Sequence, residues 1–217
     1  MKWYRWFVLL IVLLSLSPVR AQTNLSSDRT FHTGIILGAN FATLKGDLYD
    51  GYRKLGWHTG ITSFIKIRSL ATVNLELLYT QKGCRGVREI NSSYVGPMFE
   101  KYFVDLNYIE VPLQVYFQAT PLISLGGGFA YGRLLSSRED IQTDQPYYID
   151  NALYRFRDDE WSYILGAQFE FRKRYMIALR YQRSLTTVRG YFEAPPGLAT
   201  GMQYNDHFTL RLAYMLL

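Results

Sequence analysis

One stretch of fifteen residues, Asp105 to Ala119, constrains the fold of this chain most strongly. Every second residue from Ile109 to Phe117 is apolar, whereas the residues between them are mostly polar. Alternation with a period of two is typical of a β-strand that has one face against an apolar medium. The strand is about a dozen residues long where soluble strands usually have about five or six, and at about 3.3 Å per residue it can cross a bilayer at a tilt. The class of fold depends on whether its apolar face meets lipid or a protein core.

The N-terminus has the pattern of an export signal. Lys2 and Arg5 precede a short apolar run, and Val19 and Ala21 then occupy the small-residue positions of a signal-peptidase site. This pattern predicts a signal peptide over residues 1–21 and leaves residues 22–217 as one β-barrel domain. An uncleaved anchor helix remains the alternative.

The composition of the chain limits the kinds of molecule that it can be expected to bind. The 24 Lys and Arg against 18 Asp and Glu give a formal charge of +6, and removal of Lys2, Arg5 and Arg20 lowers it to 21 − 18 = +3. Much of the basic character therefore belongs to the predicted signal, and we expect no nucleic-acid partner. The single cysteine, Cys84, has no partner for an internal disulfide, and we expect it in a loop without a redox or metal role.

The alternation recurs seven more times along the chain. We expect eight strands over residues 33–41, 56–68, 72–82, 105–119, 123–135, 161–171, 175–185 and 205–217. Their connections alternate between long and short, with long loops predicted over residues 42–55, 83–102, 136–160 and 186–204. This is typical of an all-β, eight-stranded, antiparallel up-and-down transmembrane β-barrel with long outer loops and short periplasmic turns. Pro112 lacks a ladder donor and predicts a β-bulge.

Aromatic residues favour lipid over a protein core. With the strand directions assigned in this way, outward-facing aromatic side chains gather at both ends of the apolar faces, as at the two interfaces of a membrane. The predicted aromatic girdle consists of Trp57, Tyr79, Phe117, Tyr131, Trp161, Phe171, Tyr175, Tyr181 and Tyr214. The pattern predicts the bacterial outer membrane as location and its lipid as a partner. A soluble periplasmic barrel that binds an apolar ligand stays open as an alternative.

Four segments carry a family resemblance. They are GANF at residues 38–41, LELLYTQKG at 75–83, DLNYIEVPL at 105–113 and LGAQFEF at 165–171. Together they resemble the PorT-like outer-membrane β-barrel proteins of Bacteroidetes. The resemblance implies an eight-stranded barrel in the outer membrane and an accessory role in protein secretion of the type IX kind, without assigning that role to particular residues. The chain departs from such barrels at its C-terminus, where Leu217 stands in place of an aromatic residue.

Charged residues also occur on the faces that are predicted to point inward. Three acids and three bases are expected to form a lumen charge network: Lys66, Glu76, Glu110, Glu170, Arg180 and Arg211. Because an eight-stranded barrel has room only for side chains, this network predicts a plugged lumen. A path for protons or ions is the alternative. We expect no cofactor and no metal.

An enzyme is the second functional hypothesis. Ser184, Asp206 and His207 fall near the outer ends of the last two predicted strands, with His58 on the second, and a hydrolase or acyltransferase would need such groups at one rim. Asp206 and His207 are neighbours in one strand and therefore point to opposite faces, which argues against catalysis. The loop residues 145–150 and 154–159 are rich in Tyr, Arg and Asp, which suits contact with protein partners. The favoured reading is a structural or partner-binding barrel.

Overall fold

The computed structural model describes residues 31–46, 49, 51–67, 70–92, 96–143, 155–171, 174–190 and 202–216. The predicted signal peptide lies outside these residues. So do residues 145–150, part of the 154–159 segment and the terminal Leu217. No helix of the described residues is long and apolar enough to cross a membrane.

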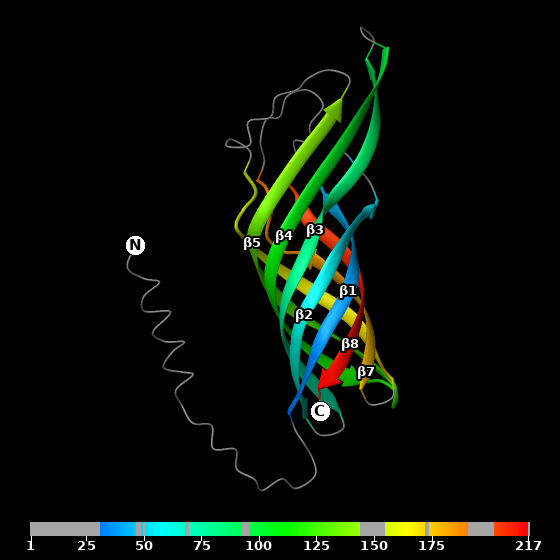
Figure 1. Cartoon of the computed structure of the whole chain (residues 1–217), viewed down its shortest axis with the longest axis vertical. Coiled ribbons are helices and arrows are strands. Elements are labelled where there is room, and N and C mark those ends of the chain that lie inside the picture. The colour runs from blue at the N-terminus through cyan, green and yellow to red at the C-terminus, as the bar shows by residue number, and fades with distance from the viewer. Residues whose placement is uncertain are drawn as a thin grey trace, which may run out of the picture.

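Eight antiparallel strands close into a barrel, because β1 pairs with β8 as well as with β2 (Figure 1). The strands are β1 (Phe31–Lys45), β2 (Lys54–Ile67), β3 (Ala71–Ser92), β4 (Gly96–Gln118), β5 (Ile123–Thr143), β6 (Asp159–Phe171), β7 (Tyr175–Ser184) and β8 (Tyr204–Leu216). This confirms the predicted class and the order of the strands. We call the end with the β2–β3, β4–β5 and β6–β7 connections the turn end, and the opposite end the loop end. In outer-membrane barrels the long loops face the outside.

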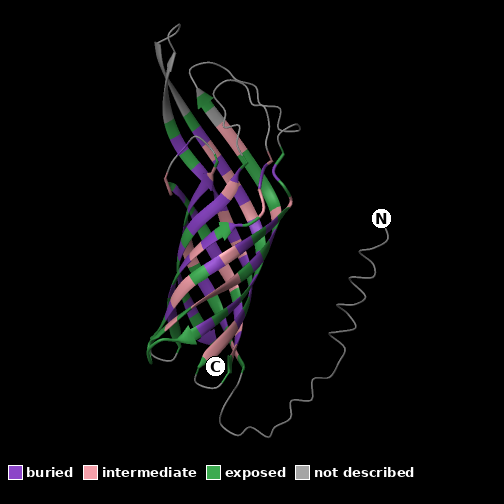
Figure 2. Ribbon diagram, turned by 180° about the vertical axis from the view of Figure 1, so that it is seen from behind, coloured by how far each residue is buried: buried purple, intermediate pink, exposed green. Residues whose placement is uncertain are grey.

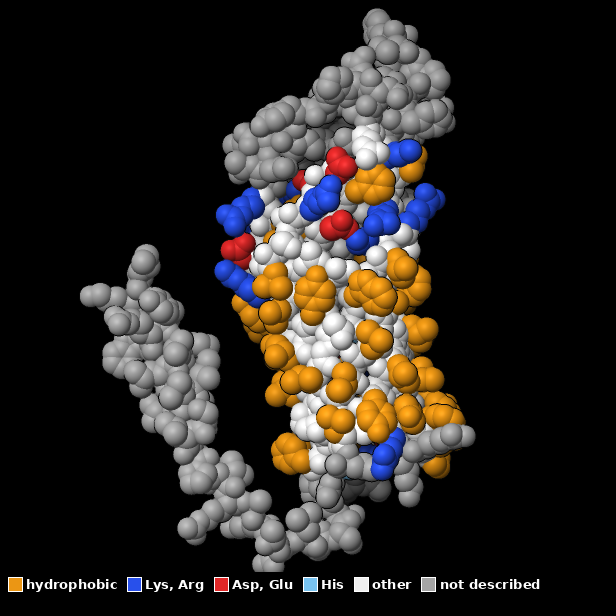
Figure 3. All heavy atoms as spheres, in the orientation of Figure 1, with side chains coloured by type: hydrophobic (Ala, Val, Ile, Leu, Met, Phe, Trp, Pro, Cys, Tyr) orange, Lys and Arg blue, Asp and Glu red, His pale blue; other side chains and the backbone are white. Residues whose placement is uncertain are grey.

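Buried and exposed residues alternate along most of the strands where burial is described (Figure 2), as expected when side chains point in turn to the lumen and to the outside. Tyr108, Glu110 and Gln114 on β4 are at most 1% exposed, whereas Ile109 and Leu113 are 41% and 55% exposed. Apolar residues of comparable exposure surround the barrel as a belt, visible as the orange band in Figure 3. Examples from seven strands are Ile35, Leu37, Ile61, Leu77, Leu113, Leu165, Leu179 and Leu210, each 49–58% exposed. A water-soluble protein rarely exposes so much contiguous apolar surface, so the belt fits lipid.

Three strands extend well past the belt at the loop end, and this corrects two of the predicted loops. β3, β4 and β5 contain 22, 23 and 21 residues, and β3 pairs with β4 as far as Ser92↔Gly96. We call their outer parts the extension, residues 83–92, 96–107 and 135–143. Cys84, expected in a loop, is in β3 and 1% exposed.

Pro112 does not form the expected bulge. The register between β3 and β4 is the same on both sides of it, from Leu75↔Leu113 to Leu78↔Glu110. Pro112 lies inside this pairing, where its missing donor removes a hydrogen bond without shifting the strands. The register shift in β4 and β5 occurs instead between Asn107 and Tyr108, where the extension begins.

Candidate functional site: the lumen and the loop end

A buried ion cluster lies in the lumen, where Glu76 accepts hydrogen bonds from two arginines. Arg180 Nη1 and Nη2 donate to its two carboxylate oxygens at 2.8 Å, and Arg211 does the same at 2.9 Å. All three residues are 2% exposed. Paired bonds of this kind are strong because charge and planar geometry both match. We call these three residues the Glu76 clamp, which ties β3 to β7 and β8.

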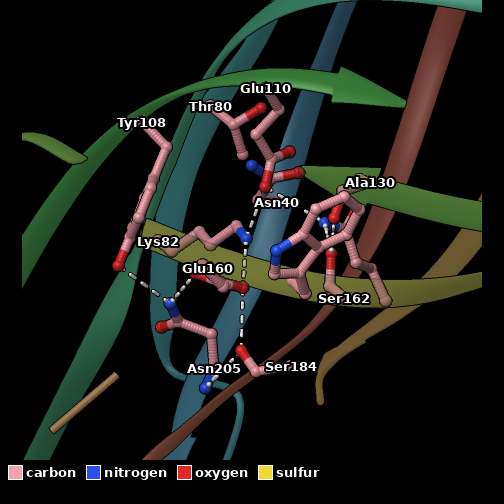
Figure 4. A network of polar contacts seen from close by, with 12 residues as sticks. Asn40, Thr80, Lys82, Tyr108, Glu110, Ala130, Glu160, Ser162, Ser184 and Asn205 are labelled. Atoms are coloured by element: carbon pink, nitrogen blue, oxygen red, sulfur yellow. Dashed lines mark hydrogen bonds and ion pairs between the residues drawn. The ribbon is translucent and has the colours of Figure 1, made fainter. Parts of the chain in front are cut away.

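A second network surrounds Lys82. Its Nζ atom lies 2.5 Å from Glu110 Oε1 and 2.8 Å from Glu160 Oε1, between the two acids (Figure 4). Ser184 Oγ and Asn205 Nδ2 each donate a hydrogen bond of 2.7 Å to Glu160. We call these five residues the Lys82 network.

The two networks balance each other in charge. The Glu76 clamp has two bases and one acid, and the Lys82 network has one base and two acids, so the six buried charges sum to zero. Burying a charge costs several kcal/mol unless partners compensate it. The lumen is thus filled by neutralised ionic layers.

Apolar side chains close the lumen on the loop side of these layers. The loop-end cluster consists of Leu44, Tyr49, Cys84, Tyr102, Val104, Leu106, Tyr108, Phe156 and Val188. Along β4 its members precede Glu110, so the cluster covers the Lys82 network toward the loops. It joins the extension to residues of three connections, represented by Tyr49, Phe156 and Val188.

A smaller apolar group closes the turn side. This turn-end cluster consists of Ile36, Phe64, Leu78, Met176, Ala213 and Met215. Along β8, Arg211 is followed by Ala213 and Met215 on the lumen face, so these two residues lie on the turn side of Arg211. Leu78 instead follows Glu76 along β3 and pairs with Glu110, so it lies on the loop side of Glu76. Buried ion pairs and two apolar clusters thus occupy the lumen of the described barrel.

Two of the six predicted network residues lie elsewhere. Lys66 and Glu170 pair with each other at 3.1 Å at the turn end, with side chains 43% and 47% exposed. They border a cavity of about 360 Å³ together with Phe64 and Met215. The prediction that they belong to one buried network with Glu76 is therefore wrong: they lie in the mouth, where the barrel opens to solvent.

The buried ion pairs of the lumen include two residues outside the predicted network, Lys82 and Glu160. Lys82 faces inward on β3 by simple alternation, so its burial was readable from the sequence. Glu160 falls in the predicted loop over residues 136–160, but the structure places it in β6, where it is 1% exposed. The contact between Lys82 and Glu160 joins residues 78 positions apart, and no local pattern encodes it.

The predicted aromatic residues all face outward. Trp57, Phe117, Trp161 and Phe171 are 46–63% exposed. Several pair across neighbouring strands: the ring centroids of Tyr131 and Trp161 are 5.3 Å apart, those of Tyr175 and Tyr214 5.3 Å, and those of Tyr181 and Phe208 5.1 Å. Tyr79 donates a hydrogen bond of 3.1 Å to Asn107.

The residues considered for catalysis do not form a relay. Ser184 Oγ donates to Glu160 and accepts from the Asn205 backbone at 3.1 Å. Neither ring nitrogen of His207 has a hydrogen-bond partner among the described residues, and Asp206 accepts from Tyr181 on the outer face. His58 contacts Thr80 at 3.3 Å. Nucleophile, base and acid therefore lack the contacts that a triad requires.

Polar contacts around Glu139 connect the loop-end cluster to the extension. Arg189 Nη1 and Nη2 donate to Glu139 at 2.9 and 2.5 Å, and Tyr102 donates to the same carboxylate. The Arg189 guanidinium also lies 3.8 Å from the Phe156 ring centroid. Burial raises the pKa of Tyr102 well above its ordinary value, and the charge of Glu139 adds to the effect. The loop that contains Arg189 is thus bound to the extension by an ion pair with Glu139 and to the neighbouring connection by a cation–π contact with Phe156.

Within the described part of the chain, no three His, Cys, Asp or Glu side chains are grouped as a metal site would require.

The closed ring of antiparallel strands, its apolar belt and its filled lumen define a small β-barrel of the bacterial outer membrane. The chain belongs to the outer membrane protein beta-barrel domain family, whose model matches residues 8–215. Comparison with curated protein sequences finds no significant match.

Solved structures of similar architecture are distant in sequence. Ail of Yersinia pestis, the attachment invasion locus protein, solved in complex with the heparin analogue sucrose octasulfate, is 15% identical, with 87% of this chain and 100% of that chain covered and a TM-score of 0.44. Neisserial surface protein A is 11% identical, with coverages of 86% and 97% and a TM-score of 0.43. OprG from Pseudomonas aeruginosa is 9% identical, with coverages of 86% and 94% and a TM-score of 0.37. The family match, and not these structures, assigns the chain to its family.

Proposed function

We propose that this barrel is a membrane anchor with a closed lumen that presents its loop end to protein partners. One observation carries the proposal: the loop-end cluster packs three connections against three extended strands and forms a single block above the belt. A block that is ordered before binding loses less conformational entropy when a partner arrives.

The outer face of the extension has the composition of a contact surface. Arg85, Val87 and Arg138 are exposed on it, and a hollow of about 200 Å³ is lined by Phe103, Asp105, Arg138, Asp140 and Gln142. Arginine and aromatic side chains are enriched in protein interfaces. The surface supports a protein partner and not a nucleic acid.

The lumen argues against the two competing functions. A diffusion pore needs a hydrated path, and buried ion pairs and apolar clusters occupy the lumen where such a path would run. An enzyme needs an assembled reactive group, and Ser184 and His207 are not in contact. The soluble periplasmic barrel is excluded by the family and by the exposed belt.

The resemblance to PorT-like barrels supports an accessory role in protein secretion as the particular form of this partner function. Deletion of the gene should then change the set of secreted proteins, and the wild-type gene should restore it. A variant with Arg138→Glu, which reverses a charge on the extension, should restore it less well. Unchanged secretion after deletion would contradict the secretion role and leave the partner role standing.

Two further assignments belong to the same proposal. Residues 1–21 act as a signal peptide, so the intact mass of the membrane form should correspond to a chain that begins at Gln22. The nine aromatic residues of the girdle lie at the two membrane interfaces. Their outward orientation and their cross-strand pairs support this placement.

Site-specific photo-crosslinking tests the partner role. A photoreactive amino acid replaces Val87 on the extension, which is 53% exposed, or Leu165 in the belt, which is 57% exposed. In native outer membranes we expect protein adducts of defined mass from the Val87 position and none from the Leu165 position. The same adducts from both positions, or none from Val87, would contradict the proposal.

A further inference from the structure

The segment from Arg155 to Asp159 places alternate side chains inside and outside the loop-end block. Phe156 is 4% exposed and belongs to the loop-end cluster, whereas Arg155 and Arg157 are exposed. The backbone is fixed on both sides: Arg157 N–H donates to Val188 at 2.8 Å, and Asp158 accepts from Leu134 N–H at 2.7 Å. Two arginines are therefore held facing outward by a buried anchor between them.

These arginines line a hollow directly above the apolar belt. The hollow has a volume of about 530 Å³ and is lined by Arg155, Phe156, Arg157, Asp158, Asp159, Trp161 and Thr186. Trp161 is a residue of the outer aromatic ring and is 52% exposed. One wall of the hollow is thus continuous with the surface that faces the acyl chains. Charged side chains of both signs gather at this level, just above the orange band in Figure 3.

The two acids of the hollow, Asp158 and Asp159, already form ion pairs with another base, Arg133. Arg133 Nη1 lies 2.7 Å from Asp159 and its Nη2 3.3 Å from Asp158, and Tyr131 donates to Asp159 at 2.5 Å. Arg155 reaches Asp158 only at 3.8 Å, with its own side chain 78% exposed. Three bases against two acids leave a net positive charge beside Trp161.

We propose that Arg155 and Arg157 bind the anionic, phosphate-bearing headgroup of a lipid in the leaflet that faces the loop end. The phosphate lies between the two guanidinium groups, which suit its geometry, and the acyl chains descend over Trp161 onto the belt. A basic residue near a membrane surface attracts anionic lipid by about fivefold in affinity. The site is independent of the proposed protein partner.

Trp161 provides a local readout. Trp3 and Trp6 lie in the predicted signal peptide, so Trp57→Phe leaves Trp161 as the single tryptophan of the form purified from outer membranes. This protein is reconstituted in phosphatidylcholine vesicles that contain brominated phosphatidic acid or brominated phosphatidylcholine, and the bromine quenches Trp161 fluorescence by contact. We expect brominated phosphatidic acid to occupy the site at least about fivefold more strongly.

Two double variants test whether Arg155 and Arg157 cause the preference for brominated phosphatidic acid. Arg155→Gln with Arg157→Gln should reduce the ratio to about one, whereas Arg53→Gln with Arg85→Gln, which removes two exposed bases outside the hollow, should leave it unchanged. Equal quenching by both lipids in the starting protein would overturn the proposal, as would a preference that survives the first double variant. Loss of the preference on addition of inorganic phosphate would show a site for the free anion and would also overturn it.

Discussion

Arg211 and Glu76 are 135 positions apart in the chain, and both terminal nitrogens of the arginine donate to the carboxylate at 2.9 Å. Arg180 approaches the same carboxylate through two bonds of 2.8 Å. The last strand is thus tied across the lumen to the third. One acid compensates two buried bases, so the fold is most sensitive at the acid.

Replacement of that acid should destabilise the barrel strongly. Glu76→Gln keeps the size of the side chain but leaves two buried arginines without a counter-charge, and we expect a loss of about 3–5 kcal/mol in the free energy of unfolding. Urea titration in detergent micelles measures it. Glu170→Gln breaks the exposed pair with Lys66 and should cost less than about 1 kcal/mol. Equal losses in the two variants would contradict the role of the Glu76 clamp.

Gly83 should be required for the extension. Its φ is +122°, and a Cβ atom there would lie 2.0 Å from the Val104 carbonyl oxygen, so Gly83→Ala combines strain with a backbone clash. We expect faster protease cleavage of the loop end. The matched control is Gly190→Ala, where nothing lies within 4 Å of the added atom. An unchanged cleavage rate for Gly83→Ala would show that the extension adapts.

Cys84 should be unreactive in the folded protein. It is 1% exposed in the loop-end cluster, so a maleimide should label it only after denaturation. Introduction of a thiol at Val87, on the exposed face of the same strand, should give labelling at least about a hundredfold faster. Rapid labelling of Cys84 in native membranes would mean that the cluster opens.

The loop-end cluster should loosen in alkali. Burial and the neighbouring Glu139 raise the pKa of Tyr102 in the folded state above the unfolded value of about 10. A raised pKa means that the stabilisation is complete below about pH 10 and is lost as the pH rises through the folded-state pKa. Protease sensitivity of the loop end should therefore increase in that range. Tyr102→Phe should abolish this alkaline increase in protease sensitivity. If the variant shows the same increase, a group other than Tyr102 causes it.

The alternation of β4 was enough to predict a strand, its two faces and the belt, because the membrane imposes a period of two over a long stretch. Glu76, Arg180 and Arg211 were placed in the lumen for the same reason. The extension was missed because Gly83 and the polar residues after it resemble a loop. The strand continues there because Tyr102, Val104 and Leu106 find apolar partners in distant loops. The acids that lie beside Lys82 are determined by how the barrel closes, and the local sequence does not encode them.

Current through the purified barrel tests the closed lumen most directly. The protein is inserted into planar lipid bilayers, with a general diffusion porin as the positive control in the same membranes. Because buried ion pairs and two apolar clusters occupy the lumen, we predict no steady conductance step above the bare bilayer. Reproducible steps of constant size from the wild-type protein, with insertion verified by protease protection, would contradict the account.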